Sequence, residues 1–382
     1  MVTKTGLLSL VIFLTACSTL SPVPSVSRAG LESQWTKPTH DEKFIEHRKI
    51  NRMTPVLVGD DYVLQGNNIN DLVLINRHIP IVEWKRTFEG GVEAGAVYFK
   101  GRIYVTTNDS TVQALDAKNG NTIWSFSTST ENTSAPILDT NSGLLYFQNA
   151  QNIVFALDAQ NGRQVWIYSK PDNSLLTIRG AATPTLHNGV IYVGFSEGSF
   201  AALNASNGQL LWENQLNRNK RFKDVDAQAV PYKDMIIVSG YDDKIYALNA
   251  KTGQLIWNYP AGSYSAVAIV GSELYASTTD SRIVKLNADT GEVIWTKSGV
   301  KGLGTTPVVF KDFLIYGESQ GSLQVIDRNK GQKITHFQPG RGIFSEPLFD
   351  EKTMSLYFIS GEANLHKMRL VLNPTNPFDY IP

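Results

Sequence analysis

The stretch ALDAKNGNTIW (Ala114–Trp124) recurs along the chain with small changes, and each copy ends in tryptophan. The other copies are ALDAQNGRQVW (Ala156–Trp166), ALNASNGQLLW (Ala202–Trp212), ALNAKTGQLIW (Ala247–Trp257) and KLNADTGEVIW (Lys285–Trp295). The intervals between the terminal tryptophans are 42, 46, 45 and 38 residues. A period of this size is typical of one supersecondary unit that repeats, so the unit predicts the whole fold. Because the stretch repeats, no single copy is expected to be an active site.

Each copy indicates two strands joined by a tight turn. Apolar and polar residues alternate before an Asn-Gly or Thr-Gly pair, and they alternate again into the tryptophan. Asn119, Asn161 and Asn207 precede the turn glycine, and we expect them to supply the positive φ that such a hairpin needs. Two further β-rich runs precede each copy, for example Val190–Gly194 and Met235–Gly240. Four short strands repeating in this way predict the blades of an all-β propeller.

Weaker copies of the unit complete the count. Leu74–Trp84 has the terminal tryptophan, and Val325–Phe337 has phenylalanine where the pattern expects tryptophan. These copies give seven blades, near residues 50–84, 92–124, 133–166, 180–212, 226–257, 264–295 and 304–337. Residues 342–372 supply three strands, and Gln34–Lys37 supplies one more. Pairing the two chain ends gives an eighth blade that closes the ring and leaves no exposed sheet edge at the seam.

Prolines and tryptophans have repeated places in this scheme. We expect the prolines to open the innermost strands, where a missing N–H is tolerated; they are Pro55, Pro136, Pro184, Pro307 and Pro347. We expect the tryptophans to pack between neighbouring blades rather than stack on a cofactor; they are Trp84, Trp124, Trp166, Trp212, Trp257 and Trp295.

The composition and the motifs give no support for catalysis. The 382 residues include 35 basic and 35 acidic side chains, so there is no net charge to indicate nucleic-acid binding. The sequence lacks a phosphate-binding loop, a nucleophile elbow and a zinc-protease motif. Its six histidines are dispersed and have no cysteine beside them. We therefore expect no catalytic residue, no cofactor and no metal site.

The start of the chain predicts export and lipidation. Lys4 and the apolar run Leu7–Leu14 precede Leu14-Thr15-Ala16-Cys17, and Cys17 is the only cysteine. This pattern predicts a lipoprotein signal peptide over residues 1–16 and acylation of Cys17; the alternative is an ordinary signal peptide with an incidental cysteine. Ser18, in place of Asp, favours sorting to the outer membrane, with the protein facing the periplasm. We predict a tether over 17–32, the propeller over 33–372 and a loose tail over 373–382.

Two long connections interrupt the repeat on either side of the fourth blade. They are 167–183 (IYSKPDNSLLTIRGAAT) and 213–228 (ENQLNRNKRFKDVDAQ). Both join an outermost strand to the next innermost strand, so they should be neighbours on one face of the ring. Apolar residues beside Arg179 in the first connection, and a basic run ahead of Asp224 and Asp226 in the second, indicate a protein-binding patch. The alternative is two solvated loops whose apolar residues fold back onto the ring.

Two families resemble this chain. The motif Ala-Leu-Asp-Ala-x-x-Gly-x-x-x-Trp is similar to the blade motif of quinoprotein dehydrogenases, which bind pyrroloquinoline quinone with calcium and use a vicinal Cys–Cys disulfide. A chain with a single cysteine cannot form that disulfide, so this resemblance supports the fold and weighs against the activity. A quinoprotein-type or sugar-binding propeller, or a scaffold for another envelope complex, remains the alternative function.

The second resemblance is more specific. The lipoprotein start, Leu176-Thr177-Ile178-Arg179-Gly180 and the Arg-x-x-Asp-Val-Asp sequence ending at Asp226 resemble the BamB family of outer-membrane protein assembly factors. The resemblance implies a non-enzymatic scaffold that binds the POTRA domains of the barrel subunit BamA and that contacts unfolded clients. It implies partner-binding roles for Leu176, Ile178, Arg179, Asp224 and Asp226. Ile178 stands where the family pattern has leucine, which preserves the apolar volume.

Overall fold

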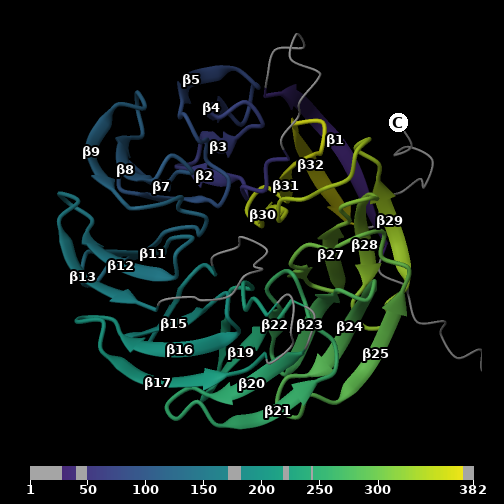
Figure 1. Cartoon of the computed structure of the whole chain (residues 1–382). Coiled ribbons are helices and arrows are strands. Elements are labelled where there is room, and N and C mark those ends of the chain that lie inside the picture. The colour runs from purple at the N-terminus through teal and green to yellow at the C-terminus, as the bar shows by residue number, and fades with distance from the viewer. Residues whose placement is uncertain (1–27, 40–49, 171–181, 218–222, 242–243, 373–382) are drawn as a thin grey trace, which may run out of the picture.

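The chain forms a ring of eight β-sheets around a central axis (Figure 1). The computed structural model describes residues 28–39, 50–170, 182–217, 223–241 and 244–372. All 32 elements in these ranges are strands, and every sheet has four antiparallel strands. The predicted eight-bladed propeller is confirmed. Within the same ranges there is no helix with the length and apolar character needed to cross a membrane.

The first four blades follow one another along the chain, each from its innermost to its outermost strand. Blade 1 comprises β2 (Val56–Val58), β3 (Tyr62–Gly66), β4 (Asp71–Asn76) and β5 (Val82–Thr87). Blade 2 comprises β6 (Ala96–Phe99), β7 (Arg102–Thr106), β8 (Thr111–Asp116) and β9 (Thr122–Ser127). Blade 3 comprises β10 (Ile137–Asp139), β11 (Leu144–Gln148), β12 (Ile153–Asp158) and β13 (Gln164–Ser169). Blade 4 comprises β14 (Thr185–His187), β15 (Val190–Gly194), β16 (Ser199–Asn204) and β17 (Leu210–Gln215).

The remaining blades follow the same order until the last one. Blade 5 comprises β18 (Val230–Tyr232), β19 (Met235–Ser239), β20 (Ile245–Asn249) and β21 (Leu255–Tyr259). Blade 6 comprises β22 (Ala268–Val270), β23 (Glu273–Thr278), β24 (Arg282–Asn287) and β25 (Val293–Ser298). Blade 7 comprises β26 (Val308–Phe310), β27 (Phe313–Gly317), β28 (Leu323–Asp327) and β29 (Lys333–Phe337). Blade 8 comprises β30 (Leu348–Asp350), β31 (Ser355–Ile359), β32 (Asn364–Leu372) and, as its outermost strand, β1 (Ala29–Pro38).

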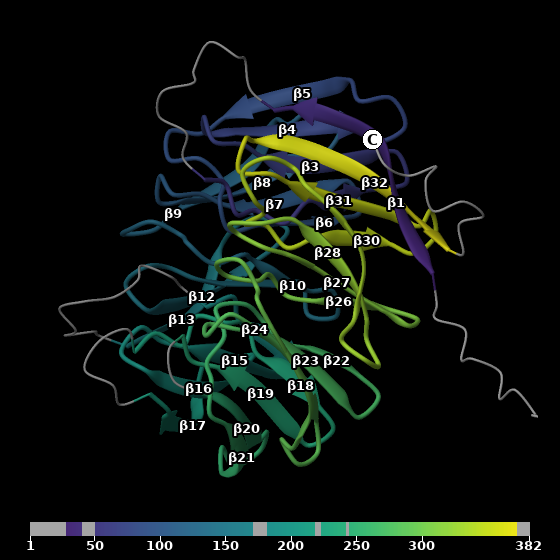
Figure 2. The same ribbon diagram turned by 90° about the vertical axis from the view of Figure 1, so that its right-hand side faces the viewer.

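The two ends of the described chain close the ring by pairing with each other. β1 runs antiparallel to β32, from Ala29 opposite Leu372 to Pro38 opposite Asn364 (Figure 2). The strand begins at Ala29, so the last four residues of the predicted tether over 17–32 belong to the blade. Ala29 and Leu31 are buried because they pack into the apolar cluster between blades 7 and 8. This apolar contact is the reason that the regular strand starts earlier than predicted.

The turn glycine, rather than the asparagine before it, has the left-handed conformation. Gly120 has φ +73°, and a Cβ added there would lie 2.9 Å from the ring of Trp84 in the previous blade. Asn119 instead accepts a hydrogen bond from the Asn121 N–H through its side chain, 2.9 Å away. Gly162, Gly208, Gly253, Gly291 and Gly331 repeat this geometry against the preceding tryptophan. The expectation for Asn119, Asn161 and Asn207 was therefore wrong, because the close indole requires a residue without Cβ.

The tryptophans join neighbouring blades. The Trp84 indole N–H donates to the Ala117 carbonyl of blade 2 at 3.0 Å, and Trp295 donates to the Arg328 carbonyl of blade 7 at 3.0 Å. The same bond is made by Trp124, Trp166, Trp212 and Trp257. In blade 7, Thr335 has the register position of the tryptophan, opposite Val325. Phe337, two residues later, packs on Phe358 and His366 of blade 8 and supplies the contact between these two blades.

Candidate functional site

The two long connections leave the ring on the same face. They run from β13 to β14 and from β17 to β18. Lys170, at the end of β13, pairs with the Glu197 carboxylate of the β15–β16 turn at 2.7 Å. Gln215, at the end of β17, donates its amide N–H to the Glu197 carbonyl at 2.9 Å. The described ends of both connections therefore meet at one residue, as the repeat predicts.

Part of the predicted partner-binding set lies outside the described residues. This applies to Leu176, Ile178 and Arg179, because residues 171–181 are not described, and it applies to the lipidation residue Cys17. The second connection is described from residue 223 onward, and this part contains Asp224 and Asp226.

Asp224 is buried beneath the turns of two neighbouring blades. Its side chain has no solvent exposure, and its carbonyl accepts a hydrogen bond from the Tyr241 N–H at 3.2 Å. The next residue, Val225, donates its N–H to the Phe195 carbonyl at 3.3 Å. A Cβ on Gly194 would lie 2.0 Å from the Val225 carbonyl oxygen, so the close approach of the two chains depends on that glycine. The expected direct contact of Asp224 with a partner is not available in this conformation, because the side chain is enclosed by its own fold.

Asp226 lies on the wall of the central cavity rather than on the outer rim. Its Oδ1 atom is buried and has no hydrogen-bond partner. Burial, with a smaller contribution from the charge of Asp224, raises the pKa of the Asp226 carboxyl to about 7. The carboxyl therefore exchanges its proton near neutral pH, and a cation placed beside it would favour the charged form.

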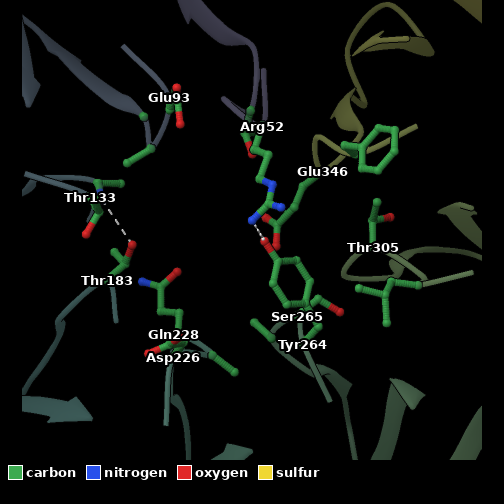
Figure 3. A pocket seen from close by; sticks show the side chains of 18 of the residues that line it. Arg52, Glu93, Thr133, Thr183, Asp226, Gln228, Tyr264, Ser265, Thr305 and Glu346 are labelled. Atoms are coloured by element: carbon green, nitrogen blue, oxygen red, sulfur yellow. Dashed lines mark hydrogen bonds between the residues drawn. The ribbon is translucent and has the colours of Figure 1, made fainter. Parts of the chain in front are cut away.

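The central cavity has a volume of about 490 Å³, and all eight blades contribute to its wall (Figure 3). Three carboxylates line it: Glu93 ahead of β6, Asp226 ahead of β18 and Glu346 ahead of β30. Thr306 donates a hydrogen bond to Glu346, and burial raises the pKa of that carboxyl. The cavity is therefore acidic and accepts hydrogen bonds on several sides.

One arginine crosses part of this cavity. The Arg52 guanidinium donates to the Tyr264 hydroxyl at 2.6 Å, and its central carbon lies 5.4 Å from the Tyr264 ring centroid. Tyr264 in turn packs edge to face on Tyr241, with the ring centroids 6.3 Å apart. Among the described residues, the basic group that faces the cavity is thus already engaged with blade 6, across the ring from blade 1.

These residues do not fit a quinone cofactor. Pyrroloquinoline quinone carries three carboxylates, whereas the described residues of the cavity wall include three carboxylates and one arginine that is bonded to Tyr264. Where both are ionised, the carboxylates of the cavity and of the cofactor repel each other in a partly desolvated site. Among the side chains that the structure describes, no group of three or more His, Cys, Asp or Glu is placed to hold a metal ion. The only cysteine of the chain, Cys17, also excludes a vicinal disulfide.

Of these cavity residues, the sequence indicated only Asp226, and it did not indicate Arg52, Tyr264 or Glu346. Arg52, Asp226 and Tyr264 each lie four residues before an innermost strand, and Glu346 lies two residues before one. The first three share a position in the repeat at which each blade has a different side chain. The differences between copies therefore indicate which residues line the central cavity, whereas the motif itself does not.

Comparison with known proteins places the chain in a family. The family model described as outer membrane protein assembly factor BamB matches residues 77–297 and 225–371. The chain belongs to the BamB family. The BamB of Moranella endobia is 25% identical over 280 residues, which are 72% of this chain and 71% of that protein.

Solved structures agree on the fold. The crystal structure of BamB from Moraxella catarrhalis has a TM-score of 0.75 and 17% identity, and covers 89% of this chain and 99% of its own. The quinohemoprotein alcohol dehydrogenase from Comamonas testosteroni has a TM-score of 0.73 and 14% identity, and covers 89% of this chain and 76% of its own. At such low identity both likenesses show the fold alone, so the propeller does not by itself distinguish BamB from the dehydrogenase.

Proposed function

We propose that the protein is a non-enzymatic scaffold of the outer-membrane β-barrel assembly machinery. It is anchored to the outer membrane by lipid on Cys17 and faces the periplasm, and it binds the POTRA region of a BamA-like barrel subunit. The observation that carries this proposal is the BamB family match over residues 77–371, together with relatives named as outer membrane protein assembly factors.

The placement of the two long connections supports a single docking face. Both leave the ring beside Glu197, so 171–181 and 218–222 start from neighbouring points. In this proposal Leu176 and Ile178 fill an apolar pocket on the partner, and Arg179 pairs with a partner carboxylate or carbonyl. These contacts bury a small apolar centre next to a charge-assisted bond, which is a common arrangement at protein interfaces.

The two aspartates have different roles in the proposal. Asp226 lies beside the cavity with a buried oxygen that has no hydrogen-bond partner, and it accepts a bond from a partner lysine or arginine. Asp224 is enclosed within the second connection, and its charge contributes to the raised pKa of the Asp226 carboxyl. Asp224 is therefore a positioning residue, and Asp226 is the group that the partner contacts.

The cavity carboxylates belong to different blades rather than to one cluster. They lie on blades 2, 5 and 8, and no three or more His, Cys, Asp or Glu side chains among the described residues are placed to hold a metal ion. The same ring offers large docking surfaces on its two faces and its rim, which is what a scaffold requires.

Binding to the partner can be tested by pull-down with the periplasmic region of the barrel subunit. We expect Arg179→Ala and Asp226→Ala each to weaken binding by roughly 10- to 100-fold, as for a central interface residue. Arg163→Ala and Asp234→Ala are matched controls, because both residues are exposed on turns at the opposite ends of their blades. Full binding by both test variants, with thermal melts near wild type, would refute the site. Failure of the wild-type protein to co-purify with the barrel subunit would refute the function.

A further inference from the structure

The turn between β4 and β5 in blade 1 departs from the polar turns of the repeat. Blades 2 to 6 have Asn-Gly or Thr-Gly here and blade 7 has Lys330-Gly331, whereas blade 1 has Ile79-Pro80-Ile81. Ile79 is 63% exposed and Ile81 is 58% exposed, the highest values for large apolar side chains among the described residues. Val82 follows at 39%. We call Ile79, Pro80, Ile81 and Val82 the apolar tip.

The apolar tip is held in shape by its own hydrogen bonds. The Asn76 side chain accepts bonds from the His78 and Ile79 N–H groups, at 3.0 and 3.1 Å. The Asn76 N–H donates to the Ile81 carbonyl at 2.9 Å, and the Ile81 N–H donates to the Ile79 carbonyl at 2.6 Å. The isoleucines are therefore exposed by a defined turn, which costs free energy in water and is typical of a binding surface.

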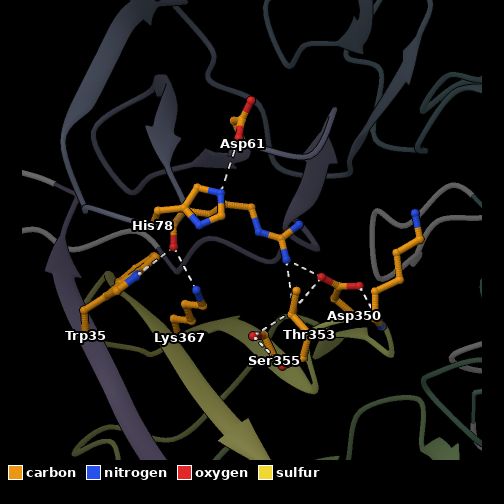
Figure 4. A network of polar contacts seen from close by, with 9 residues as sticks. Trp35, Asp61, His78, Asp350, Thr353, Ser355 and Lys367 are labelled. Carbon is orange, nitrogen blue, oxygen red and sulfur yellow. Dashed lines mark hydrogen bonds and ion pairs between the residues drawn. The ribbon is translucent and has the colours of Figure 1, made fainter.

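The base of the apolar tip is fixed to the closing blade (Figure 4). Arg77 forms a buried ion pair with Asp350, and its carbonyl accepts bonds from Trp35 at 3.2 Å and from Lys367 at 2.9 Å. His78 lies 3.3 Å from the Asp61 carboxylate in the neighbouring turn of the same blade. A turn that is fixed on two sides can press its side chains into a partner without losing much conformational entropy.

The chain enters β1 on this same face of the ring. Arg77 donates to Thr353 in the turn between β30 and β31, at 3.0 Å. Met354 of that turn accepts a bond from the Leu370 N–H at 2.8 Å. β32 continues from Leu370 to Leu372, which is opposite Ala29. Ala29 and the apolar tip are thus on one face, and the two long connections, at the other ends of their outermost strands, are on the opposite face.

We propose that the apolar tip enters the interface of the lipid bilayer to which the chain is anchored. The proposal rests on the proposed lipid attachment at Cys17, which is twelve residues before Ala29. Even fully extended, twelve residues span only about 40 Å, so Ala29 lies within that distance of the bilayer. Isoleucine side chains gain free energy on leaving water for the acyl boundary. This orientation directs the connections around Arg179 and Asp226 away from the membrane, toward a periplasmic partner.

The experiment uses the full lipoprotein with one added thiol. Because Cys17 is the only cysteine and is acylated in the proposal, Ile81→Cys gives a single site for an environment-sensitive fluorophore. Ser206→Cys is the matched control, since Ser206 is exposed on the equivalent polar turn of blade 4. Both proteins are reconstituted on vesicles of phosphatidylethanolamine and phosphatidylglycerol, with and without nitroxide-labelled lipid. Ile79→Cys serves as a second tip variant if Ile81→Cys lowers the thermal melt.

We expect a blue-shifted emission and strong quenching by nitroxide lipid at residue 81, and little change at residue 206. Equal quenching at both positions, or none at residue 81 on vesicle-bound protein, would overturn the proposal and leave the lipid anchor intact. A shift at residue 81 that needs the barrel subunit would also overturn it, in favour of a protein partner. A protein that does not float with vesicles would refute both the anchor and the docking.

Discussion

Replacement of Arg77 by methionine tests how the ring is closed. The Arg77 side chain, 4% exposed, pairs with Asp350, which is 9% exposed, across the seam between blades 1 and 8. Methionine keeps most of the length of the side chain but leaves the Asp350 carboxylate buried without its cation. The bonds from Trp35 and Lys367 go to the Arg77 carbonyl, so the substitution leaves their acceptor in place.

The expected loss is large because only one partner of a buried pair is removed. Such a change costs about 3–5 kcal/mol of unfolding free energy. The ring from Ala29 to Leu372 has roughly 340 residues, which gives an unfolding entropy of about 0.7 kcal/mol/K at about 2.1 cal/mol/K per residue. The melting temperature should therefore fall by about 4–7 °C. Additional replacement of Asp350 by leucine should recover much of this loss, because it removes the buried charge.

The assay is thermal unfolding followed by circular dichroism, with Arg369→Met as the matched control. Arg369 pairs with Glu32 in the same blade at 2.5 Å, but the two side chains are 52% and 38% exposed. An exposed pair contributes less than about 1 kcal/mol, so the control should melt within about 2 °C of wild type. If Arg77→Met also melts within that range, the ion pair does not hold the seam and the reasoning is wrong.

The pH dependence of stability gives a second test of the ion pair between Arg77 and Asp350. Burial alone would raise the pKa of the Asp350 carboxyl, but hydrogen bonds from Thr353 and Arg77 lower it below the ordinary value. A carboxyl whose pKa is lowered by folding stabilises the protein above its unfolded pKa, and this contribution is lost as the pH falls through the folded pKa. The difference between wild type and Arg77→Met should therefore shrink between pH 5 and pH 3.

Three further outcomes are expected. Asp226→Asn should raise the unfolding free energy at pH 8 by at most about 4 kcal/mol, because the folded pKa of the Asp226 carboxyl, about 7, lies above the ordinary 3.8. This gain should decline as the pH falls toward 4, because Asp226 of the wild type is then protonated and neutral as well. Gly208→Ala should lower the melting temperature more than Gly189→Ala, since both have φ near +73° but only the first Cβ meets a neighbour, the Trp166 ring at 2.6 Å. Added pyrroloquinoline quinone and calcium should leave no absorbing cofactor on the protein after gel filtration, because no group of described side chains is placed to hold the calcium that this cofactor needs.

Each of these outcomes can fail on its own. If Asp226→Asn and wild type have the same unfolding free energy across pH 4–8, ionisation of the Asp226 carboxyl does not destabilise the folded protein. Equal losses for Gly208→Ala and Gly189→Ala would show that the indole contact contributes nothing beyond the backbone conformation. A retained chromophore would restore the quinoprotein alternative.

The ring was predictable because its unit repeats. The alternation around each Asn-Gly or Thr-Gly turn gives strands, the spacing of the tryptophans gives blades, and Pro55 and its equivalents stand directly before the innermost strands. The pairing of the segment around Trp35 with the C-terminal strands was also predictable. The last blade has only three strands from the C-terminal part of the chain, so one more strand is needed to complete it. The start of this strand at Ala29 was not predictable from the repeat, because it depends on apolar contacts between blades 7 and 8.

The site was less predictable, because its geometry depends on departures from the repeat. The carboxylates of Asp224 and Asp226 stand in a polar run that resembles a solvated loop, yet Gly194 lets Val225 approach closely and draws Asp224 under the neighbouring turns. The cavity residues Arg52 and Tyr264 are 212 positions apart and meet only across the ring. The position four residues before each innermost strand indicates that both residues face the cavity, but one copy of the repeat does not show that they contact each other.

The shared eighth sheet also orders events during synthesis. Its outermost strand β1 is made before all the other described strands, and its partner β32 is made after them. The first strand therefore stays without its partner until nearly the entire polypeptide has been made. A product that lacks β30, β31 and β32 cannot complete the circle, so a closed ring shows that synthesis passed the last strand.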